Sequence, residues 1–283
     1  MDAGKLSYPG PVPSVTGAEF LDLLVPVESK PQQQAIADFL DAETARIDAL
    51  IAKKRQMANL LETRFRMKID QCMTSLAASE AALGRFVTAL GQGSSLQAAG
   101  RPAEREEWGV LKLSAVKFGL YKPQENKALE RQPDDVPLVP RVGDLLVTRS
   151  NTPAYVGDVA AVTHASPQRM LPDLIYRLRL DNTRISSEFA AYALLTSRSR
   201  HNISALARGS SQSMVKLRGE DIRCLPVPAA ALHVQERVVA SLNHRRKQTS
   251  EVLDKLERQI ELLAEHRQAL ITAAVTGGPR CRA

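Results

Sequence analysis

The sequence has few aromatic residues, few cysteines and no long hydrophobic run. The last two shortages argue against a disulfide-stabilised protein and a membrane-spanning protein. Aromatic residues make up only 4% of the 283 residues. The three cysteines are odd in number and far apart, so they form no disulfide framework or metal-ligand spacing. No window approaches the roughly 18 apolar residues of a membrane-spanning helix. The opening MDAGKLSYPGPVPS lacks the apolar centre of a signal peptide. We therefore expect a cytoplasmic protein.

Sequence signatures of catalytic sites are also missing. The chain has no G-x-x-x-x-G-K-[S/T] phosphate loop and no H-E-x-x-H or Cys/His metal spacing. No glycine-rich turn follows a strand in a βαβ context, which argues against a dinucleotide or S-adenosylmethionine fold. Glu125-Asn126-Lys127 matches the E-x-K of some nucleases, but no candidate Asp precedes it closely. We expect no catalytic residues, no metal site and no cofactor.

Positive charge is concentrated in the middle of the chain. The formal net charge is +7, and the segment 74–225 holds 20 Lys and Arg against 15 Asp and Glu. The segments 32–70 and 233–273 each carry seven basic and six acidic residues. This distribution favours contact between the middle segment and a polyanion, although a basic isoelectric point alone is equally compatible with no DNA role.

One internal repeat relates the two ends of the chain. LLVPVESKPQQQAIADFL (23–40) aligns with LPVPAAALHVQERVVASL (225–242), and LLETRFRMKI (60–69) aligns with LLAEHRQALI (262–271). Each copy begins with an extended, proline-containing entry and continues for about 40 residues without Pro or Gly, which predicts a long helix. At 1.5 Å per residue each helix would be roughly 60 Å long.

Apolar residues recur at three-to-four spacing along both predicted helices, as in a coiled-coil seam. Because such stripes do not remain exposed, we expect the helices to pair within one chain or between chains; packing on a globular core is the alternative. The residues assigned to this subunit or helix interface are Ile36, Leu40, Ile47, Leu50, Met57, Leu61, Leu253, Leu256, Ile260 and Leu263.

Between the helices the pattern changes to short apolar runs separated by Gly, Pro, Asn and Asp. Candidate strands are 108–113, 144–149, 156–163 and 174–180, followed by a helical stretch at 187–206. We predict an α+β protein in which one mixed α/β domain is flanked by two long helices that form a coiled coil. Trp108 is expected in the core.

Two polar segments of this middle region could contact DNA. TRSNTPAYVGD (148–158) and ARGSSQSMVKL (207–217) combine basic residues with short polar side chains that suit phosphates and base edges. An ordinary turn or surface loop is the competing interpretation of each. The candidate DNA-binding residues are Arg149, Ser150, Asn151, Arg208, Ser210, Ser211, Gln212, Ser213 and Lys216. A third basic stretch (112–127) has lysines every five residues, and we interpret it as solvated.

Several of these segments together resemble one protein family. The segment from LLVPVESKPQQQ to MANLLETR resembles the conserved spacer of type I restriction–modification specificity subunits, and LPVPAAALHVQERVVASL resembles its distal copy. WGVLKLSAV, VGDLLVTRSNTPAYVGDVA and ARGSSQSMVKLRGEDIRCLPVP are similar to a target-recognition domain. The resemblance implies that the middle domain is a target-recognition domain and that the two long helices form an antiparallel coiled coil. It further implies a non-catalytic subunit that binds double-stranded DNA and directs a methyltransferase subunit and a restriction/motor subunit to a split site.

The sequence departs from that family pattern because it holds a single complete recognition domain, where a full subunit has two. We predict a remnant of a preceding domain at 1–24, spacer helix 25–72, recognition domain 73–228, second helix 229–276 and a disordered tail at 277–283. The chain is expected to be a natural half-subunit, which would form a homodimer through its helices, or a truncated product. The alternative function is a coiled-coil interaction protein without specific DNA readout.

Overall fold

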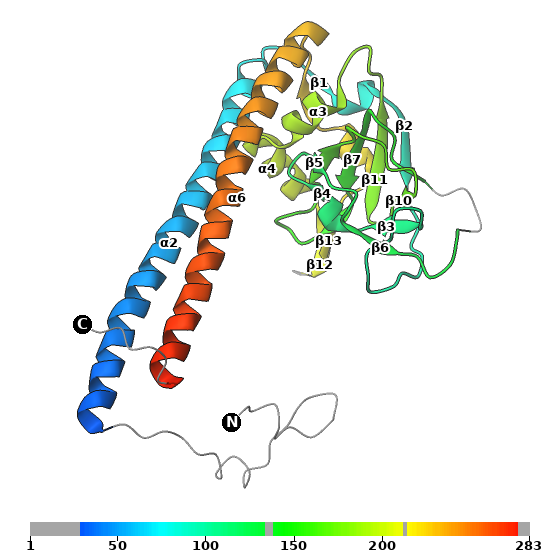
Figure 1. Cartoon of the computed structure of the whole chain (residues 1–283). Coiled ribbons are helices and arrows are strands. Elements are labelled where there is room, and N and C mark those ends of the chain that lie inside the picture. The colour runs from blue at the N-terminus through cyan, green and yellow to red at the C-terminus, as the bar shows by residue number, and fades with distance from the viewer. Residues whose placement is uncertain (1–28, 134–137, 212–213, 277–283) are drawn as a thin grey trace. The chain divides into compact units, whose positions relative to one another are not determined.

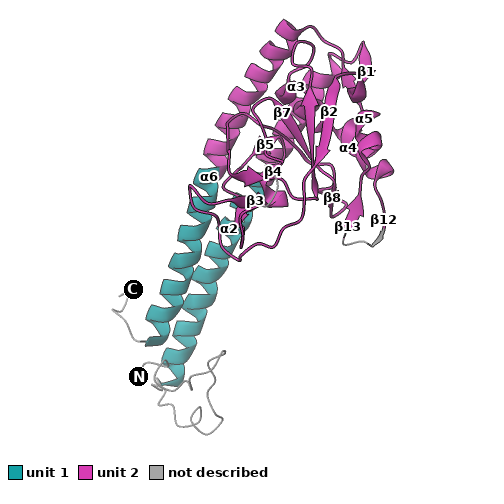
Figure 2. Ribbon diagram, turned by 90° about the vertical axis from the view of Figure 1, so that its right-hand side faces the viewer, with its two compact units in different colours: residues 1–58, 254–283 teal, residues 59–253 magenta. Residues whose placement is uncertain are grey.

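The computed structural model describes residues 29–133, 138–211 and 214–276, and the side chains of 210 and 211 are outside the description (Figure 1). Its contacts divide the chain into two compact units, Met1–Ala58 with Asp254–Ala283 and Asn59–Leu253 (Figure 2). Both dividing points fall within long helices, whereas the predicted domain boundaries lie at the ends of those helices. The predicted boundaries therefore stay a prediction. The predicted N-terminal remnant and C-terminal tail lie outside the described residues.

Two long helices provide the described part of the first unit. Helix α2 spans Lys30–Thr74 and helix α6 spans Leu232–Thr276, and both extend into the second unit. Within the first unit they run antiparallel, since Lys54 Nζ donates to Gln259 Oε1 at 2.7 Å and Arg267 Nε lies 3.0 Å from Asp48 Oδ1. None of the described helices is long and apolar enough to cross a membrane.

The apolar seam between these helix segments contains Ile47, Ile51 and Leu256, which are 4%, 8% and 6% exposed. Of the predicted interface residues, Ile47 and Leu256 are buried. Half-buried positions are Ile36, Leu40, Leu61, Leu253, Ile260 and Leu263. Leu50 and Met57 are 41% and 50% exposed, so the helix pair of one chain does not bury them; Ile51, which is also within about one turn of Ile47, packs in the seam instead of Leu50. As contacts of a second subunit they stay a prediction.

A four-stranded antiparallel sheet forms the centre of the second unit. Its strand order is β2 (Val87–Gln92), β11 (Ile175–Leu180), β7 (Asp144–Thr148) and β9 (Val159–Ala161). β7 is buried at every position, including the polar Asp144 and Thr148 at its two ends. The three predicted strands at 144–149, 156–163 and 174–180 are therefore confirmed with shorter bounds, whereas β2 was not predicted.

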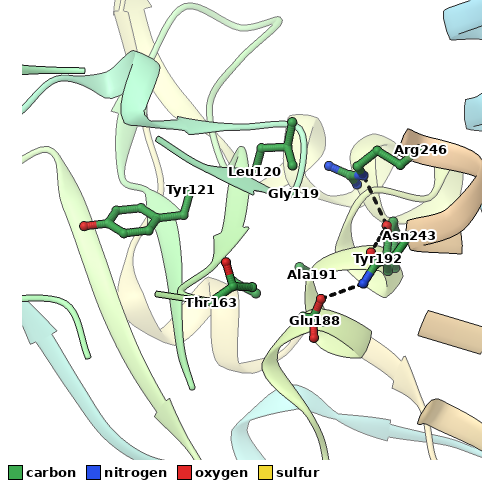
Figure 3. Close-up of a pocket in the computed structure, with 10 residues that line it drawn as sticks. Gly119, Leu120, Tyr121, Thr163, Glu188, Ala191, Tyr192, Asn243 and Arg246 are labelled. Carbon is green, nitrogen blue, oxygen red and sulfur yellow. Dashed lines mark hydrogen bonds between the residues drawn. The ribbon is translucent and has the colours of Figure 1, made fainter. Parts of the chain in front are cut away.

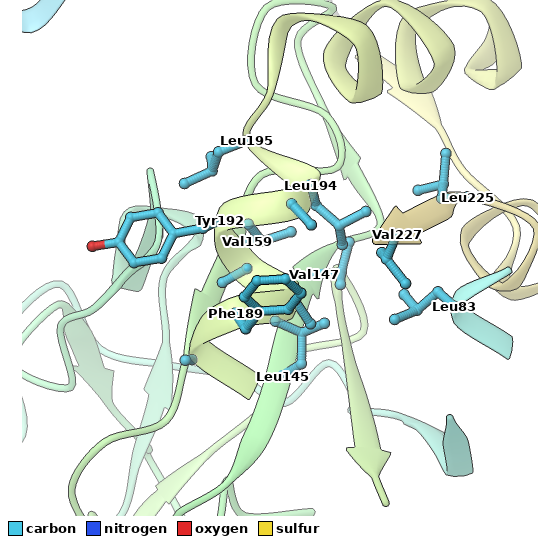
Figure 4. Packing of buried hydrophobic residues seen from close by; sticks show 14 of the residues in the cluster. Leu83, Leu145, Val147, Val159, Phe189, Tyr192, Leu194, Leu195, Leu225 and Val227 are labelled. Atoms are coloured by element: carbon cyan, nitrogen blue, oxygen red, sulfur yellow. The ribbon is translucent and has the colours of Figure 1, made fainter. Parts of the chain in front are cut away.

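Helices cover the core of this sheet. α3 (Ser187–Leu194) and α4 (Ser197–Leu206) replace the single predicted helical stretch, because the Thr196 hydroxyl accepts the Ser199 N–H and begins a new helix. α3 contributes Phe189 and Leu194 to the core, where they lie beside Leu145 and Val147 of β7 (Figure 4). The last turns of α2 join the same core through Phe65, Ile69 and Met73.

Smaller sheets complete the second unit. One has the order β10 (Arg169–Met170), β3 (Gly109–Leu111) and β6 (Asn126–Ala128). Two further pairs are antiparallel: β4 (Val116–Lys117) forms a local hairpin with β5 (Leu120–Tyr121), and β1 (Glu80–Ala82) pairs with the distant β14 (Pro226–Pro228). A short helix, α5 (Gly219–Arg223), precedes β14. Trp108 is half-buried and packs against a small cluster of Val110, Leu129 and Met170. The predicted α+β fold with two long flanking helices is confirmed.

We expect the seam and the neighbouring exposed position to respond differently to truncation. Ile47→Ala should lower the free energy of unfolding of the helix pair by about 2–4 kcal/mol, because a buried aliphatic side chain is lost. Leu50→Ala, one turn away on the same helix, should change it by less than about 0.5 kcal/mol when the protein is dilute enough to be monomeric. Urea denaturation followed by circular dichroism at the helical band measures both. Equal losses in the two variants would contradict the seam assignment.

Candidate nucleic-acid interface

Two predicted DNA-contacting segments, far apart in sequence, meet in one three-stranded sheet. Its order is β12 (Arg208–Ser211), β13 (Met214–Lys216) and β8 (Ser150–Asn151), all antiparallel. β13 pairs Val215 with Asn151 and Lys216 with Ser150. The strand pairing therefore places Asn151, Arg208 and Lys216 in one small region, which the spacing of the sequence alone does not determine.

Alternating burial along β13 anchors this sheet and leaves part of it open to solvent. Val215 and the following Leu217 belong to the main core, whereas Met214 and Lys216 are exposed. Lys216 lies opposite Arg208 in the ladder. Two like charges directly opposite each other repel, and an anion between them would relieve the repulsion. Asp221 offers Arg208 only a 3.9 Å ion pair, and no described residue forms an ion pair with Lys216.

Arg149 and Ser150 are held by the fold more firmly than the other candidates. Arg149 is half-buried, and its Nε donates to the Tyr176 hydroxyl at 3.1 Å. Its two terminal guanidinium nitrogens make no hydrogen bond to described residues. Ser150 is fully buried, and its hydroxyl has no hydrogen-bond partner among the described residues. A side chain without exposed surface cannot reach DNA in this conformation, so we omit Ser150 from the proposed contacts.

The remaining candidates are only partly described. Asn151 is half-buried, and its Oδ1 accepts the Thr152 N–H at 2.8 Å. Ser210 and Ser211 belong to β12 by their backbone, whereas Gln212 and Ser213 lie outside the described residues. In the third basic stretch, Lys112 and Ser114 both contact Glu125. These are ordinary surface contacts within the stretch itself. No group of three or more His, Cys, Asp or Glu suited to a metal occurs in the described part of the chain.

Sequence reasoning missed two charged residues that shape the loop after β8. Arg200 of α4 donates to the carbonyls of Val156, Gly157 and Ala154 at 2.8, 2.9 and 3.3 Å. Asp158 ends the loop, and its Oδ1 accepts the N–H groups of Phe118 and Val159, each at 2.9 Å. Neither position has a motif that would reveal its role, because their partners are main-chain groups distant in sequence.

The Phe118 turn links this loop to the helix segments of the same unit. Phe118 has a positive φ of 48°, which is unfavourable for a bulky residue. Its N–H is bound by Asp158, and its carbonyl accepts from Arg246 Nη1 of α6 at 2.7 Å. The guanidinium of Arg66 on α2 lies 4.1 Å from the centre of the Phe118 ring. Contacts from three elements thus hold a strained turn in place.

A shallow pocket beside this turn is lined by polar groups that satisfy one another (Figure 3). Arg246 Nε donates to the Tyr192 hydroxyl at 3.1 Å, and that hydroxyl donates to Asn243 Oδ1 at 2.7 Å. Asn243 in turn donates to Glu188 at 2.8 Å. This chain of hydrogen bonds connects α6 with α3, and it gives the pocket a structural role.

Burial raises the pKa of the Asp158 carboxyl above its ordinary value, because the charged form loses hydration. The two main-chain N–H groups, and then the positive charges of Arg200 and Arg66, oppose this shift without cancelling it. Burial lowers the pKa of the Arg200 guanidinium in the same way, while Asp158 opposes that shift. The loop is thus held by a mutually supporting, largely buried acid and base.

Comparison with known proteins supports the resemblance that was inferred from the sequence. No family model matches the chain. The type I restriction enzyme EcoEI specificity subunit of Escherichia coli is 26% identical over 195 residues, covering 68% of this chain and 33% of that protein. The chain thus spans about a third of the length of this curated relative. The similarity confirms the predicted resemblance to type I specificity subunits.

Solved structures share the fold. A chain from a study of complex assembly and conformational transition of the type I R-M system has a TM-score of 0.67 and 15% identity, over 94% of this chain and 64% of its own length. The crystal structure of the HsdS subunit from Thermoanaerobacter tengcongensis aligns over 98% of this chain and 67% of its own, at 15% identity and a TM-score of 0.47. The first of these matches shows that this chain shares the fold of that type I R-M chain.

Asp158 should give stability a measurable pH dependence. Because its folded pKa is raised, its contribution favours the folded state at low pH and is lost as pH rises from the ordinary Asp value through the raised one. Asp158→Asn keeps an acceptor oxygen and removes the titration, so its stability relative to the wild type should increase across that window. Urea unfolding of both proteins at a series of pH values measures this. Parallel profiles would contradict it.

Proposed function

We propose that this chain is a DNA-reading specificity subunit of a type I restriction–modification system and performs no catalysis itself. In this role it directs methyltransferase and restriction subunits to a split target site. The E. coli relative is named as such a subunit. The observation that carries the proposal is the pairing of β8 with β13, which joins two predicted DNA-contacting segments in one partly exposed, basic sheet. Access to cellular DNA implies a cytoplasmic location.

Two kinds of contact are assigned to this sheet. Lys216, Arg208 and Arg149 are proposed to bind phosphates or a guanine edge, which positions the sheet on the duplex. Asn151 and the segment 210–213, with Gln212 as a bidentate partner for adenine, are proposed to read base edges. Phosphate contacts give affinity for every sequence, whereas base contacts discriminate between sequences.

The alternative is a coiled-coil interaction protein that lacks specific readout. The exposed apolar side chains on α2, among them Leu50 and Met57, are the observation that favours it. Exposed apolar residues on a long helix suit a protein partner, such as the methyltransferase subunit or a second copy. A DNA-reading protein can also bind a protein partner through this helix. Binding of a protein partner therefore does not distinguish the two proposals, whereas binding of DNA does.

Salt-dependent binding to duplex DNA tests the proposed function. The logarithm of the binding constant of the wild-type chain should fall linearly with the logarithm of salt concentration, because phosphate contacts release counterions. Lys216→Ala should weaken binding to all duplexes and reduce the slope by about one. Lys53→Ala, which removes an exposed lysine of α2, is the matched control and should leave the slope unchanged. Wild-type protein without salt-dependent binding would favour the interaction-protein alternative.

We further propose that two copies associate through their helices, so that two recognition domains are present in one assembly. The exposed Leu50 and Met57 of α2 offer a surface for association. Sedimentation analysis at micromolar concentration should show a dimer, which Leu50→Glu should shift toward monomer. Sequences selected from a random duplex pool with the methyltransferase subunit present should then carry an inverted motif at a fixed gap. A strict monomer would exclude this homodimer.

A further inference from the structure

Tyr155 is unusual among the aromatic residues of the second unit because its side chain faces solvent. It is 52% exposed. The other described aromatic residues between 59 and 253 are buried or half-buried. Its ring adds little to the core and has a face available for binding a partner.

The main chain at Tyr155 is nevertheless firmly fixed. Its N–H donates to the Thr152 carbonyl at 3.0 Å, and its own carbonyl accepts from the Thr148 hydroxyl at 3.0 Å and from the Asp158 N–H at 3.1 Å. Arg200 holds the carbonyls of the residues on either side, Ala154 and Val156. Both peptide groups of Tyr155 are therefore bound, and the loop presents the ring from a defined position.

The two residues after Tyr155 account for its exposure. Gly157 has a φ of +64°, and a Cβ there would lie 2.7 Å from Ile203 and 2.8 Å from Leu217. The close packing of this glycine lets the neighbouring Val156 enter the core, where it is 0% exposed. Val156 thus anchors the loop, and Tyr155, one residue earlier, is left outside.

The surroundings of Tyr155 indicate what it binds. Its loop continues directly from β8, which pairs with β13 and brings the exposed Lys216 into the same sheet. Met214 of β13 is 44% exposed, so the sheet from which this loop continues also presents a large apolar side chain to solvent. Exposed apolar side chains accompanied by an exposed lysine suit duplex DNA, where thymine methyl groups and deoxyribose lie between phosphates.

We propose that Tyr155 contacts duplex DNA, with its ring packed against a thymine methyl group or a deoxyribose next to the phosphates bound by Lys216. This inference rests on the proposed DNA-reading function and adds a non-ionic contact to it. A ring on a rigid loop loses little conformational entropy when it binds, since the main chain is already ordered. The contact adds affinity by removing apolar surface from water, and it releases no counterion.

This distinction between apolar and ionic contacts gives a specific test. The DNA affinity of the full-length chain is measured over a range of salt concentrations for the wild type, Tyr155→Ala, Tyr155→Phe and Lys216→Ala. Tyr155→Ala should weaken binding roughly ten-fold at every salt concentration, with the slope unchanged. Tyr155→Phe keeps the ring and should retain most of the affinity. Lys216→Ala should instead reduce the slope.

Phe39→Ala is the matched control, because Phe39 is a 44% exposed aromatic residue on α2 in the other unit. It should leave DNA affinity unchanged, and the melting temperature of Tyr155→Ala should equal that of the wild type. Unchanged affinity in Tyr155→Ala, beside a salt-dependent wild type, overturns this inference and leaves the proposed function intact. A shallower slope in Tyr155→Ala overturns it as well, since the loop would then act through ionic contacts. A wild type that does not bind DNA overturns the proposed function and this inference together.

Discussion

The hydrophobic core of residues 59–253 is the constraint on which the candidate interface depends. The core holds β7 and β11 of the central sheet, α3, and the last turns of α2. It also fixes the interface from beneath, through Val215 and Leu217 around β13 and Val156 in the loop after β8. Because each of these residues is adjacent to an exposed one, the same packing that stabilises the unit determines which side chains face solvent. Lys216, Met214 and Tyr155 are exposed for this reason.

Charged side chains also hold the loop after β8 in place. Arg200 binds three carbonyls of the loop, those of Ala154, Val156 and Gly157, and Asp158 binds the N–H of Phe118 at the strained turn. Arg246 binds the other side of that turn from α6. The loop proposed to contact DNA is thereby joined to helix α6 through one residue, Phe118. A change in the loop and a change in that part of α6 would both act on the hydrogen bonds that hold Phe118.

The interface combines ionic, polar and apolar groups, and each has a separate consequence for binding. In the proposed complex, a phosphate would relieve the cross-strand repulsion between Lys216 and Arg208 and would give an affinity that depends on salt. Asn151 and the segment 210–213 are the groups proposed to distinguish bases by hydrogen bonding. Tyr155 is proposed to add an apolar contact from a preformed loop. Specificity in such a surface comes from their joint geometry, so no single residue defines a target sequence.

Local patterns in the sequence determined the elements of this protein. The proline-free, alanine- and leucine-rich repeats specify two long helices, and the short apolar runs specify strands β7, β9 and β11. Polar, basic composition likewise marked 148–158 and 207–217 as candidate DNA contacts. The exposure of Leu50 was not predictable in this way, because neighbouring apolar residues on a helix compete for the seam and only the partner helix decides between them.

Tertiary structure alone decided how those elements form a site. The pairing of β8 with β13 joins residues about sixty positions apart, and no local propensity encodes such a register. Burial of Ser150, exposure of Tyr155 and the roles of Arg200 and Asp158 follow from that arrangement. Each depends on main-chain groups brought close by folding, where side-chain type is a poor guide to partner. The sequence determined which residues were available, and the packing of the core decided which of them face solvent.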